Sequence, residues 1–243
     1  MAKNLVELLW RKASSASGTT RRGPRARHSA DDVVAGAIAL ADEGGLDAVT
    51  IRGLAHALDL TAMSIYTHVN SRADLLVLMV DEMHERMTAP IDGAGWRDRV
   101  RQVAQQNLDL FRSHPWMLDV DDPRAAVGPG TIAKYDRELH AFDGTGLSDV
   151  ERDAALSFVL DFVRASGSRM RERAEREEFG PFWDDAGPRL ATYLGDGYPL
   201  AQSVGRAAGE AMGGPYDAEV AWEFGSVRML DGLAGIIAET KGV

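Results

Sequence analysis

The chain has 243 residues, a length that suits one large domain or two small ones. It contains no cysteine, which excludes disulfide bonds, thiolate chemistry and cysteine-based zinc sites, and fits the reducing cytoplasm where we expect the protein to act. No apolar run approaches the ~20 residues of a membrane span, and the N-terminal sequence is not of the secretory type, so no membrane partner is expected.

The net charge of -10 at first argues against a nucleic-acid partner, but the charge is unevenly distributed. Residues 1–28 hold seven basic side chains and one acid, whereas residues 29–76 hold two basic side chains and seven acids. Residues 77–243 carry 18 basic side chains and 29 acids. An acidic body would repel DNA and favour docking through the basic end of the molecule.

Residues 1–28 are expected to form a flexible basic arm. Residues 4–12 have the pattern of an amphipathic turn or two, and residues 13–20 are rich in Ser, Ala, Gly and Thr, which is typical of a flexible segment. The basic stretch at 21–27 contains a glycine and a proline, so we expect it to stay extended. Its candidate DNA contacts are Arg21, Arg22, Arg25 and Arg27. The alternative to a DNA-contacting arm is a disordered, solvated tail. Both descriptions apply if the arm is disordered in the free protein and becomes ordered on DNA.

Residues 29–88 are predicted to form an N-terminal helical domain. Ser29 caps its first helix, with carboxylates in the first turn where they suit the helix dipole, and the pair Gly44-Gly45 ends it. The last helix of this domain begins after Ser71 and continues through a run of Leu and Met side chains.

Between these two helices, residues 50–69 have the pattern of two short helices joined by a tight turn. Ile51, Leu54 and Leu58 give the first a helical spacing, and Thr61 caps the second. This is the pattern of a helix-turn-helix DNA reader, whose second helix lies in the major groove.

The remainder, residues 89–243, is helical in pattern without a convincing strand, so the fold is predicted to be all-α. Helices are expected over residues 96–113 and 131–142, from Ser148 onward, in short pieces within residues 179–215, and from Asp217 to about residue 240.

Taken together, these residues resemble the TetR family of one-component transcriptional regulators over residues 29–243. That family places a glycine after the first helix, a Thr-hydrophobic-Arg start on the second, a Leu-Tyr-His-like end on the third and a basic start on the fourth. The matching residues are Gly45, Thr50-Ile51-Arg52, Ile65-Tyr66-Thr67-His68 and Arg72-Ala73-Asp74-Leu75-Leu76. The C-terminal part is similar to the tetracycline-repressor branch, through Trp96 and the sequences at 146–166 and 224–237.

The resemblance implies an all-α homodimer in which residues 89–243 bind a small-molecule effector and dimerise. It implies repression by occupying a palindromic operator, with half-sites about one helical turn (~34–36 Å) apart or a multiple. Effector binding would change the separation of the two heads and release the operator. The tetracycline-coordinating and magnesium positions do not transfer to this sequence, so neither tetracycline nor a metal or other cofactor is predicted. Activation in place of repression stays open.

The predicted reading helix carries no Lys or Arg, so it offers no bidentate contact to guanine of its own. Its exposed side is expected to present hydroxyl and methyl groups to base edges, from Thr61, Ala62, Met63, Ser64 and Thr67. Base reading by this helix would therefore be modest.

Flanking residues are expected to supply affinity. Arg52 is the candidate for a guanine contact, and Thr50 can hold a phosphate at a helix N-terminus. The resemblance favours phosphate contacts for Tyr66, His68 and Arg72. Each has a structural alternative: Thr50 is also a good helix cap, Tyr66 can pack on the first helix, and His68 can be a solvated helix end.

The effector-site prediction rests on large side chains in the C-terminal helices. The aromatic candidates are Phe111, Trp116, Tyr135, Phe158, Phe162 and Phe182. Asn107, His140 and Arg164 are the candidate polar anchors on inward-leaning faces. Plain packing of a helical core explains the same pattern. The six histidines show no metal-binding spacing.

The dimer is expected to pair the helix from Ser148 with the helix from Asp217 in a four-helix bundle across a two-fold axis. Small residues would allow close approach, although they can also pack within one subunit: Gly225, Ser226, Gly232, Ala234 and Gly235. The sequence shows no Ser/His/Asp order, no phosphate-binding loop and no carboxylate pair in a defined context, so an enzymatic function is not expected. Because the predicted reading helix carries no arginine, an alternative remains: a helical ligand-binding dimer with weak or lost DNA binding.

Overall fold

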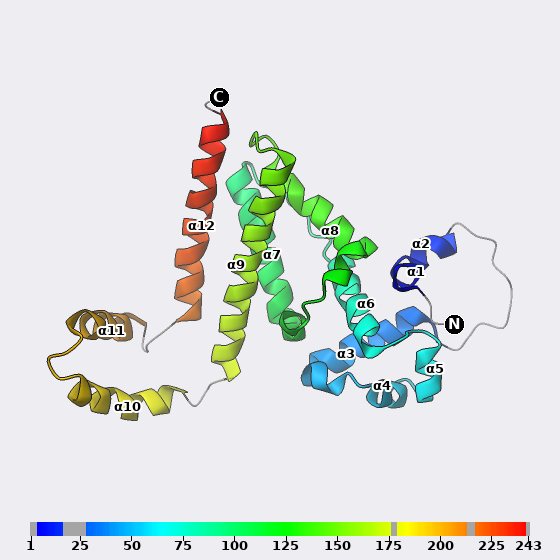
Figure 1. Ribbon diagram of the computed structural model, residues 1–243, viewed down its shortest axis with the longest axis horizontal. Coiled ribbons are helices and arrows are strands. Elements are labelled where there is room, and N and C mark those ends of the chain that lie inside the picture. The colour runs from blue at the N-terminus through cyan, green and yellow to red at the C-terminus, as the bar shows by residue number, and fades with distance from the viewer. Residues whose placement is uncertain (1–3, 17–27, 176–178, 213–216, 242–243) are drawn as a thin grey trace.

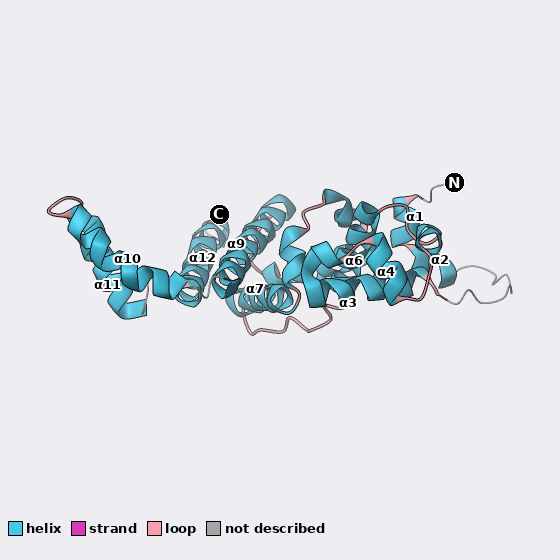
Figure 2. Ribbon diagram, turned by 90° about the horizontal axis from the view of Figure 1, so that it is seen from below, coloured by secondary structure: helices cyan, strands magenta, loops and turns pink. Residues whose placement is uncertain are grey.

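The computed structural model describes residues 4–16, 28–175, 179–212 and 217–241, and within these ranges the chain is helical without a strand (Figures 1 and 2). The all-α prediction is confirmed. The N-terminal elements are α1 (Leu5–Leu9), α2 (Arg11–Ala16), α3 (Ala30–Ala48), α4 (Ile51–Ala57), α5 (Ala62–Tyr66) and α6 (Arg72–Glu85). The C-terminal elements are α7 (Trp96–Ser113), the 3-10 helices η1 (Pro115–Asp119) and η2 (Pro123–Val127), α8 (Pro129–Leu139), η3 (His140–Phe142), α9 (Asp149–Glu175), α10 (Phe179–Leu194), α11 (Pro199–Met212) and α12 (Ala218–Lys241).

Helix caps set the boundaries of the N-terminal domain as the sequence predicts. Ser29 and Asp32 form a reciprocal capping box at the start of α3, which lowers the pKa of Asp32 through the hydrogen bonds from Ser29. The side chains of Thr61 and Ser71 accept backbone N–H groups at the starts of α5 and α6. The regular part of α3 stops at Gly45, whose φ of +68° suits glycine.

Two groups of helices build the molecule, and α6 belongs to both (Figure 1). On one side, α3, α4 and α5 close a small core with buried side chains such as Leu54, Ile65 and Leu75. On the other side, α7, α8, α9 and α12 form the C-terminal domain, where α7 packs on α9 and α9 on α12. The most extensive packing between helices joins α6 to α8, so α6 connects the two groups.

Helices α10 and α11 extend away from the body on the far side of α12 (Figures 1 and 2). They are longer than the short pieces predicted for residues 179–215, and α10 continues through Pro188. Large apolar side chains on them are exposed, including Tyr193, Tyr198 and Leu200. A surface of this kind indicates an interaction with another surface.

The N-terminal segment differs from the predicted flexible arm. Residues 5–16 are helical, and Leu8 and Leu9 of α1 are buried against the body. Two interactions explain why this segment is ordered. Asn4 caps α1, which is a local interaction, and Leu8 and Leu9 pack on apolar surface beside α6, which is a tertiary one. The four arginines predicted to contact DNA, at residues 21–27, lie outside the described residues.

Candidate DNA interface and effector domain

The exposed face of α5 carries most of the residues predicted to read bases. Ile65 is fully buried and anchors α5, whereas Met63 is 73% exposed and Tyr66 is 48% exposed. The Thr61 side chain accepts the Ser64 backbone N–H at 3.2 Å, so it is a cap as well as a surface group. Ala62 and Ser64 are half-buried at the edge of this face. The face is therefore uncharged and largely free of neighbouring elements.

Thr50 and Arg52 lie together at the start of α4. The Thr50 hydroxyl accepts the Gly53 backbone N–H at 2.9 Å, and the Arg52 side chain is exposed. A helix N-terminus with an adjacent guanidinium suits a phosphate or a base edge. This geometry is compatible with the predicted contacts.

Arg72, expected to contact a phosphate, has a structural role that sequence reasoning missed. Its Nε donates to the Val49 carbonyl at 2.7 Å, and its Nη2 donates to the Leu46 carbonyl at 2.6 Å. The guanidinium thus ties the start of α6 to the end of α3. The carbonyls belong to residues 23 and 26 positions earlier, so no local pattern could have indicated this pairing.

Inside the C-terminal domain, Asn107 belongs to a buried polar network. Glu138 is fully buried and accepts from Lys134 Nζ at 2.7 Å and from Asn107 Nδ2 at 2.8 Å. Asn107 Nδ2 also donates to the Val103 carbonyl at 2.9 Å. Burial lowers the pKa of Lys134, although the nearby Glu138 carboxylate opposes that change. Asn107, predicted as a ligand anchor, therefore already has partners within the protein.

The other predicted polar anchors also have partners within the protein. Arg164 donates to the Leu118 and Val120 carbonyls at 2.9 and 3.3 Å, and its guanidinium lies 5.4 Å from the centre of the Phe111 ring. His140 does not lean inward as expected: it is exposed and pairs with Asp143 at 2.7 Å.

The predicted aromatic set is spread over the domain rather than gathered in one pocket. Trp116 is buried and donates to Asp42 of α3, Phe162 stacks on Trp222, and Tyr135 is an exposed donor to Asp153. Phe182 is exposed on α10, and Phe111 packs in the core. Helical periodicity placed these side chains on α7 to α10, but it does not indicate which of them share a cavity.

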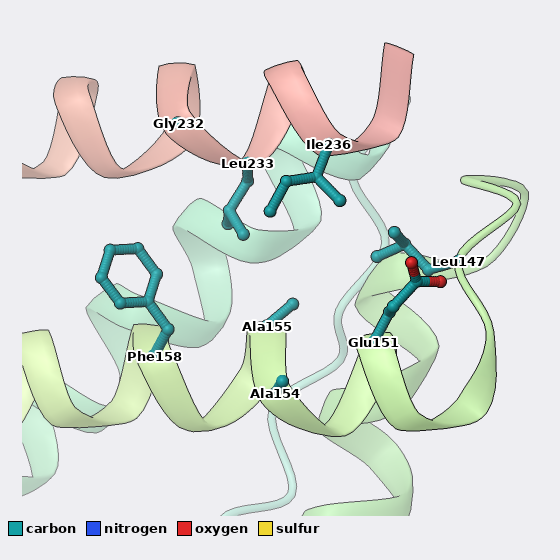
Figure 3. A pocket seen from close by; sticks show the side chains of 8 residues that line it. All are labelled: Leu147, Glu151, Ala154, Ala155, Phe158, Gly232, Leu233 and Ile236. Atoms are coloured by element: carbon teal, nitrogen blue, oxygen red, sulfur yellow. The ribbon is translucent and has the colours of Figure 1, made fainter. Parts of the chain in front are cut away.

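Phe158 lines a cavity of about 410 Å³ between α9 and α12 (Figure 3). Ala154 and Ala155 of α9 face Leu233 and Ile236 of α12 across it, and Glu151 adds a carboxylate to its lining. Phe158 and Ile236 are each about half exposed, so this apolar cavity opens onto the surface shared by α9 and α12.

A second hollow, of about 510 Å³, lies where the end of α6 meets α7. Met83 and Leu110 form apolar parts of its lining, and Arg86, Asp109 and His114 add charged or polar groups. It is open to solvent, and one of its walls belongs to the helix that also packs on α3 of the N-terminal domain.

Asp81 links α6 to α8 directly. Gly128, the residue before α8, has no side chain to cap that helix, and the buried Asp81 carboxylate accepts the Thr131 backbone N–H at 2.8 Å instead. Burial raises the pKa of Asp81, although hydrogen bonds from Thr131 oppose the rise. One turn further along α6, His84 pairs with the Thr131 hydroxyl at 2.9 Å. Burial, followed by the charges of Lys134, Arg164 and Arg137, lowers the pKa of His84 to about 3, so it is neutral.

Comparison with known proteins decides the family. A family model described as the tetracyclin repressor-like C-terminal domain matches residues 89–237. The HTH-type transcriptional repressor DrrR1 of Streptomyces coeruleorubidus is 31% identical over 98% of this chain and 87% of its own length. The chain belongs to the TetR family.

Two further relatives support that membership. The tetracycline repressor protein class E of Escherichia coli is 25% identical over 89% of this chain and 95% of its own length. The Streptomyces coelicolor TetR family protein ActR, in a crystal structure with actinorhodin, is 27% identical and superposes with a TM-score of 0.70 over 86% of this chain and 97% of that one.

This TetR family member is a DNA-binding transcriptional repressor, with α4 and α5 as its helix-turn-helix. The family consists of transcriptional regulators. Among the described residues, no helix is both long enough and apolar enough to cross a membrane. Sequence reasoning found the reading helix but missed Asp81, Lys134 and Glu138. The (i, i+4) spacing of Lys134 and Glu138 on one helix could have indicated their ion pair.

Proposed function

We propose that the protein is a homodimeric repressor that leaves its operator when a small organic effector binds between α6 and the C-terminal helices. The observation that carries the proposal is the continuity of α6. Arg72 ties its first turn to the end of α3 in the DNA-reading head, and Asp81 caps α8 in the effector domain. A displacement of α8 would therefore move the head through one rigid helix.

The dimer is supported by an apolar face that α9 and α12 leave uncovered in the single chain. Phe158 of α9 and Phe224 of α12 are 52% and 64% exposed, and Val220, Val227 and Ile236 of α12 are each about half exposed. A self-complementary two-fold pairing of these helices would bury this face and give a four-helix bundle. Two heads related by that axis fit a palindromic operator.

On DNA, we assign base contacts to the exposed face of α5 and to Arg52, and phosphate contacts to Thr50, Tyr66 and His68. Two N–H groups of Arg72 already donate to the carbonyls of Leu46 and Val49, so a phosphate would be bound by the remaining N–H groups of its guanidinium. The arginines at 21–27 would add sequence-independent affinity, because each neutralised phosphate releases counterions. An operator-binding protein acts where the DNA lies, which for this chain we take to be the cytoplasm.

The effector is supported by the relatives. The ActR structure contains actinorhodin, and the Escherichia coli relative is named as a tetracycline repressor. We infer a small organic effector for this chain as well. Its identity is not carried over, because Asn107 and Arg164, which could have served as anchors, are held by Glu138 and by backbone carbonyls.

Fluorescence anisotropy with DNA from upstream of the protein's own gene tests the proposal. The wild-type protein should bind this duplex more tightly than a scrambled one. Arg52→Ala should reduce that preference by ~5–150-fold, the equivalent of about 1–3 kcal/mol. Glu43→Ala, at an exposed position on α3, is the matched control and should bind like the wild type. Equal binding to both duplexes at physiological salt, where non-specific phosphate contacts are weak, would instead favour a ligand-binding dimer that has lost DNA recognition.

A further inference from the structure

The N-terminal helices α1 and α2 dock on the body through a small apolar face. Leu8 and Leu9 are 3% and 1% exposed, whereas Val6 of the same helix is 47% exposed. The side chain of Asn4 accepts the Val6 backbone N–H at 2.8 Å and fixes the start of α1. A five-residue helix would not persist alone in water, so its docking depends on this contact with α6.

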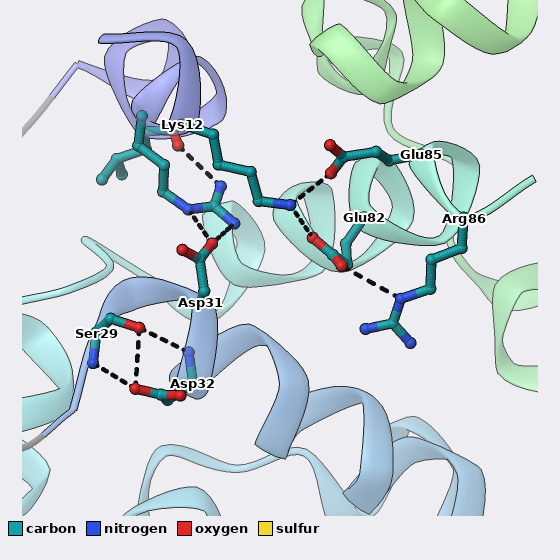
Figure 4. Close-up of polar contacts among 9 residues, drawn as sticks. Lys12, Ser29, Asp31, Asp32, Glu82, Glu85 and Arg86 are labelled. Carbon is teal, nitrogen blue, oxygen red and sulfur yellow. Dashed lines mark hydrogen bonds and ion pairs between the residues drawn. The ribbon is translucent and has the colours of Figure 1, made fainter. Parts of the chain in front are cut away.

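Three consecutive side chains then tie this segment to three different elements. Trp10 Nε1 donates to the Val127 carbonyl at the end of η2, at 3.0 Å. Arg11 Nη2 pairs with Asp31 in the first turn of α3, at 2.6 Å. Lys12 Nζ lies between two carboxylates of α6, 2.9 Å from Glu82 and 2.5 Å from Glu85 (Figure 4).

The Lys12 contacts are charged around neutral pH. Partial burial would lower the pKa of Lys12, but the hydrogen bonds to Glu85 and Glu82 outweigh it and raise the pKa. Burial alone would raise the pKa of Glu82, and its bond to Lys12 lowers it instead. Arg11 and Lys12 therefore serve contacts within the chain, although their charge first indicated a DNA-binding arm.

The place where the segment docks is the joint between head and effector domain. Val127 directly precedes Gly128, and the carboxylate of Asp81 caps the helix that follows. Gly130 packs so closely on Asp81 and Glu85 that a Cβ would overlap the α6 backbone. Lys12 holds Glu85, and Trp10 holds Val127, so the segment contacts both sides of this joint.

We propose that α1 and α2 act as an intramolecular brace, which holds the DNA-reading head in one orientation against the effector domain and so sets operator affinity. The brace would restrain α6 relative to η2 and α8. Its release would let the head sample orientations that do not fit the operator. This inference rests on the proposed function for its effect on DNA, but the restraint on the joint is measurable without DNA.

Two variants distinguish an effect on the orientation of the head from a general loss of stability. Trp10→Phe combined with Lys12→Met removes the side-chain donors to Val127, Glu82 and Glu85 and leaves the buried leucines in place. Leu9→Ala weakens docking of the whole segment. Val6→Ala, at an exposed position on the same helix, is the matched control.

Hydrogen exchange of the full-length protein, read on a peptide over residues 124–132, reports the joint. Its amides include Gly128 N–H, bonded to the Ala125 carbonyl, and Thr131 N–H, bonded to Asp81. We expect both brace variants to exchange faster there than the wild type and the control. On a duplex selected in vitro by the wild-type protein, we expect ~tenfold weaker binding for Leu9→Ala, as for a head competent in ~10% of molecules, and a smaller loss for the double variant.

Faster exchange confined to residues 5–16, with unchanged exchange over residues 124–132, would overturn the brace. So would unchanged DNA affinity in variants whose joint exchanges faster. If the wild type selects no duplex at all, the proposed function fails and the effect on operator affinity fails with it. The exchange measurement then still decides whether α1 and α2 restrain the joint.

Discussion

Replacing Glu138 with alanine tests the buried polar network of the effector domain. The carboxylate accepts two hydrogen bonds, one from Lys134 and one from Asn107, and each is worth about 1.5–3 kcal/mol because the acceptor is charged. The variant also leaves the buried Lys134 without its carboxylate. Breaking a buried pair on one side costs about 3–5 kcal/mol, which agrees with the sum of the bonds. Against a total of about 5–15 kcal/mol, this is a large fraction of the stability.

Urea denaturation of Glu138→Ala against the wild type measures this loss. The matched control is Lys134→Met with Glu138→Gln, which removes both charges and keeps an acceptor for Asn107. It should cost about 1 kcal/mol or less, because the desolvation of the pair disappears with the pair. If the single variant lost less than ~1 kcal/mol, or the control lost as much as the single variant, the network would not be held by this charge pair.

The pH dependence of Glu138→Gln provides an independent check. Without the carboxylate, burial depresses the pKa of Lys134 further, so the folded protein gives up this proton at a lower pH than the unfolded chain. The unfolded state then binds more protons, and stability rises with pH up to the ordinary lysine pKa of 10.5. The deficit of the variant should shrink over that range, and a deficit that grows with pH would refute the argument.

Three further predictions concern the joint and the DNA contacts. Gly130→Ala should lower stability by about 1–3 kcal/mol in thermal unfolding, because its methyl group would overlap the backbone of Asp81; an unchanged Tm would contradict this close packing. The pKa of Glu82 is lower in the folded protein than its ordinary value of 4.5, so the ionised side chain stabilises the fold above pH 4.5 and this stabilisation is lost as the pH falls through the pKa of the folded state. Glu82→Gln should therefore weaken the loss of stability in acid, and an unaltered profile of stability against pH would exclude this contribution. Replacing the arginines in residues 21–27 with glutamine should make the slope of log K against log salt less negative by roughly 0.9 for each phosphate that they neutralise in the wild type, and an identical slope would show that they neutralise none.

Local features of the fold were predictable because their causes lie within a few residues. The caps at Ser29, Thr50 and Thr61 follow from a hydroxyl placed before an apolar helical spacing, and the structure confirms each. Docking of Leu8 and Leu9 was not predictable. Their apolar surface is supplied by α6, more than sixty residues later in the chain, and short amphipathic turns give no signal of a distant partner.

The effector domain shows the limit of helical periodicity. The pattern correctly indicates that Phe111 and Trp116 face inward, because both are buried. It does not separate a side chain that fills a core from one that lines a cavity, since both need the same spacing. Asn107 illustrates the point: its inward position was expected, but its partner Glu138 comes from α8 and decides that it serves the network.

The position of Arg72 changes how the charge of the head should be understood. The described part of the head between residues 29 and 76 contains two arginines, and one of them is bonded to the carbonyls of Leu46 and Val49. Arg11 and Lys12 are likewise paired with acids of α3 and α6. These three basic side chains therefore stabilise the fold. Arg52 is an exposed cation at the start of α4 in the reader, so operator discrimination should depend on it more strongly than the basic composition of the N-terminus suggests.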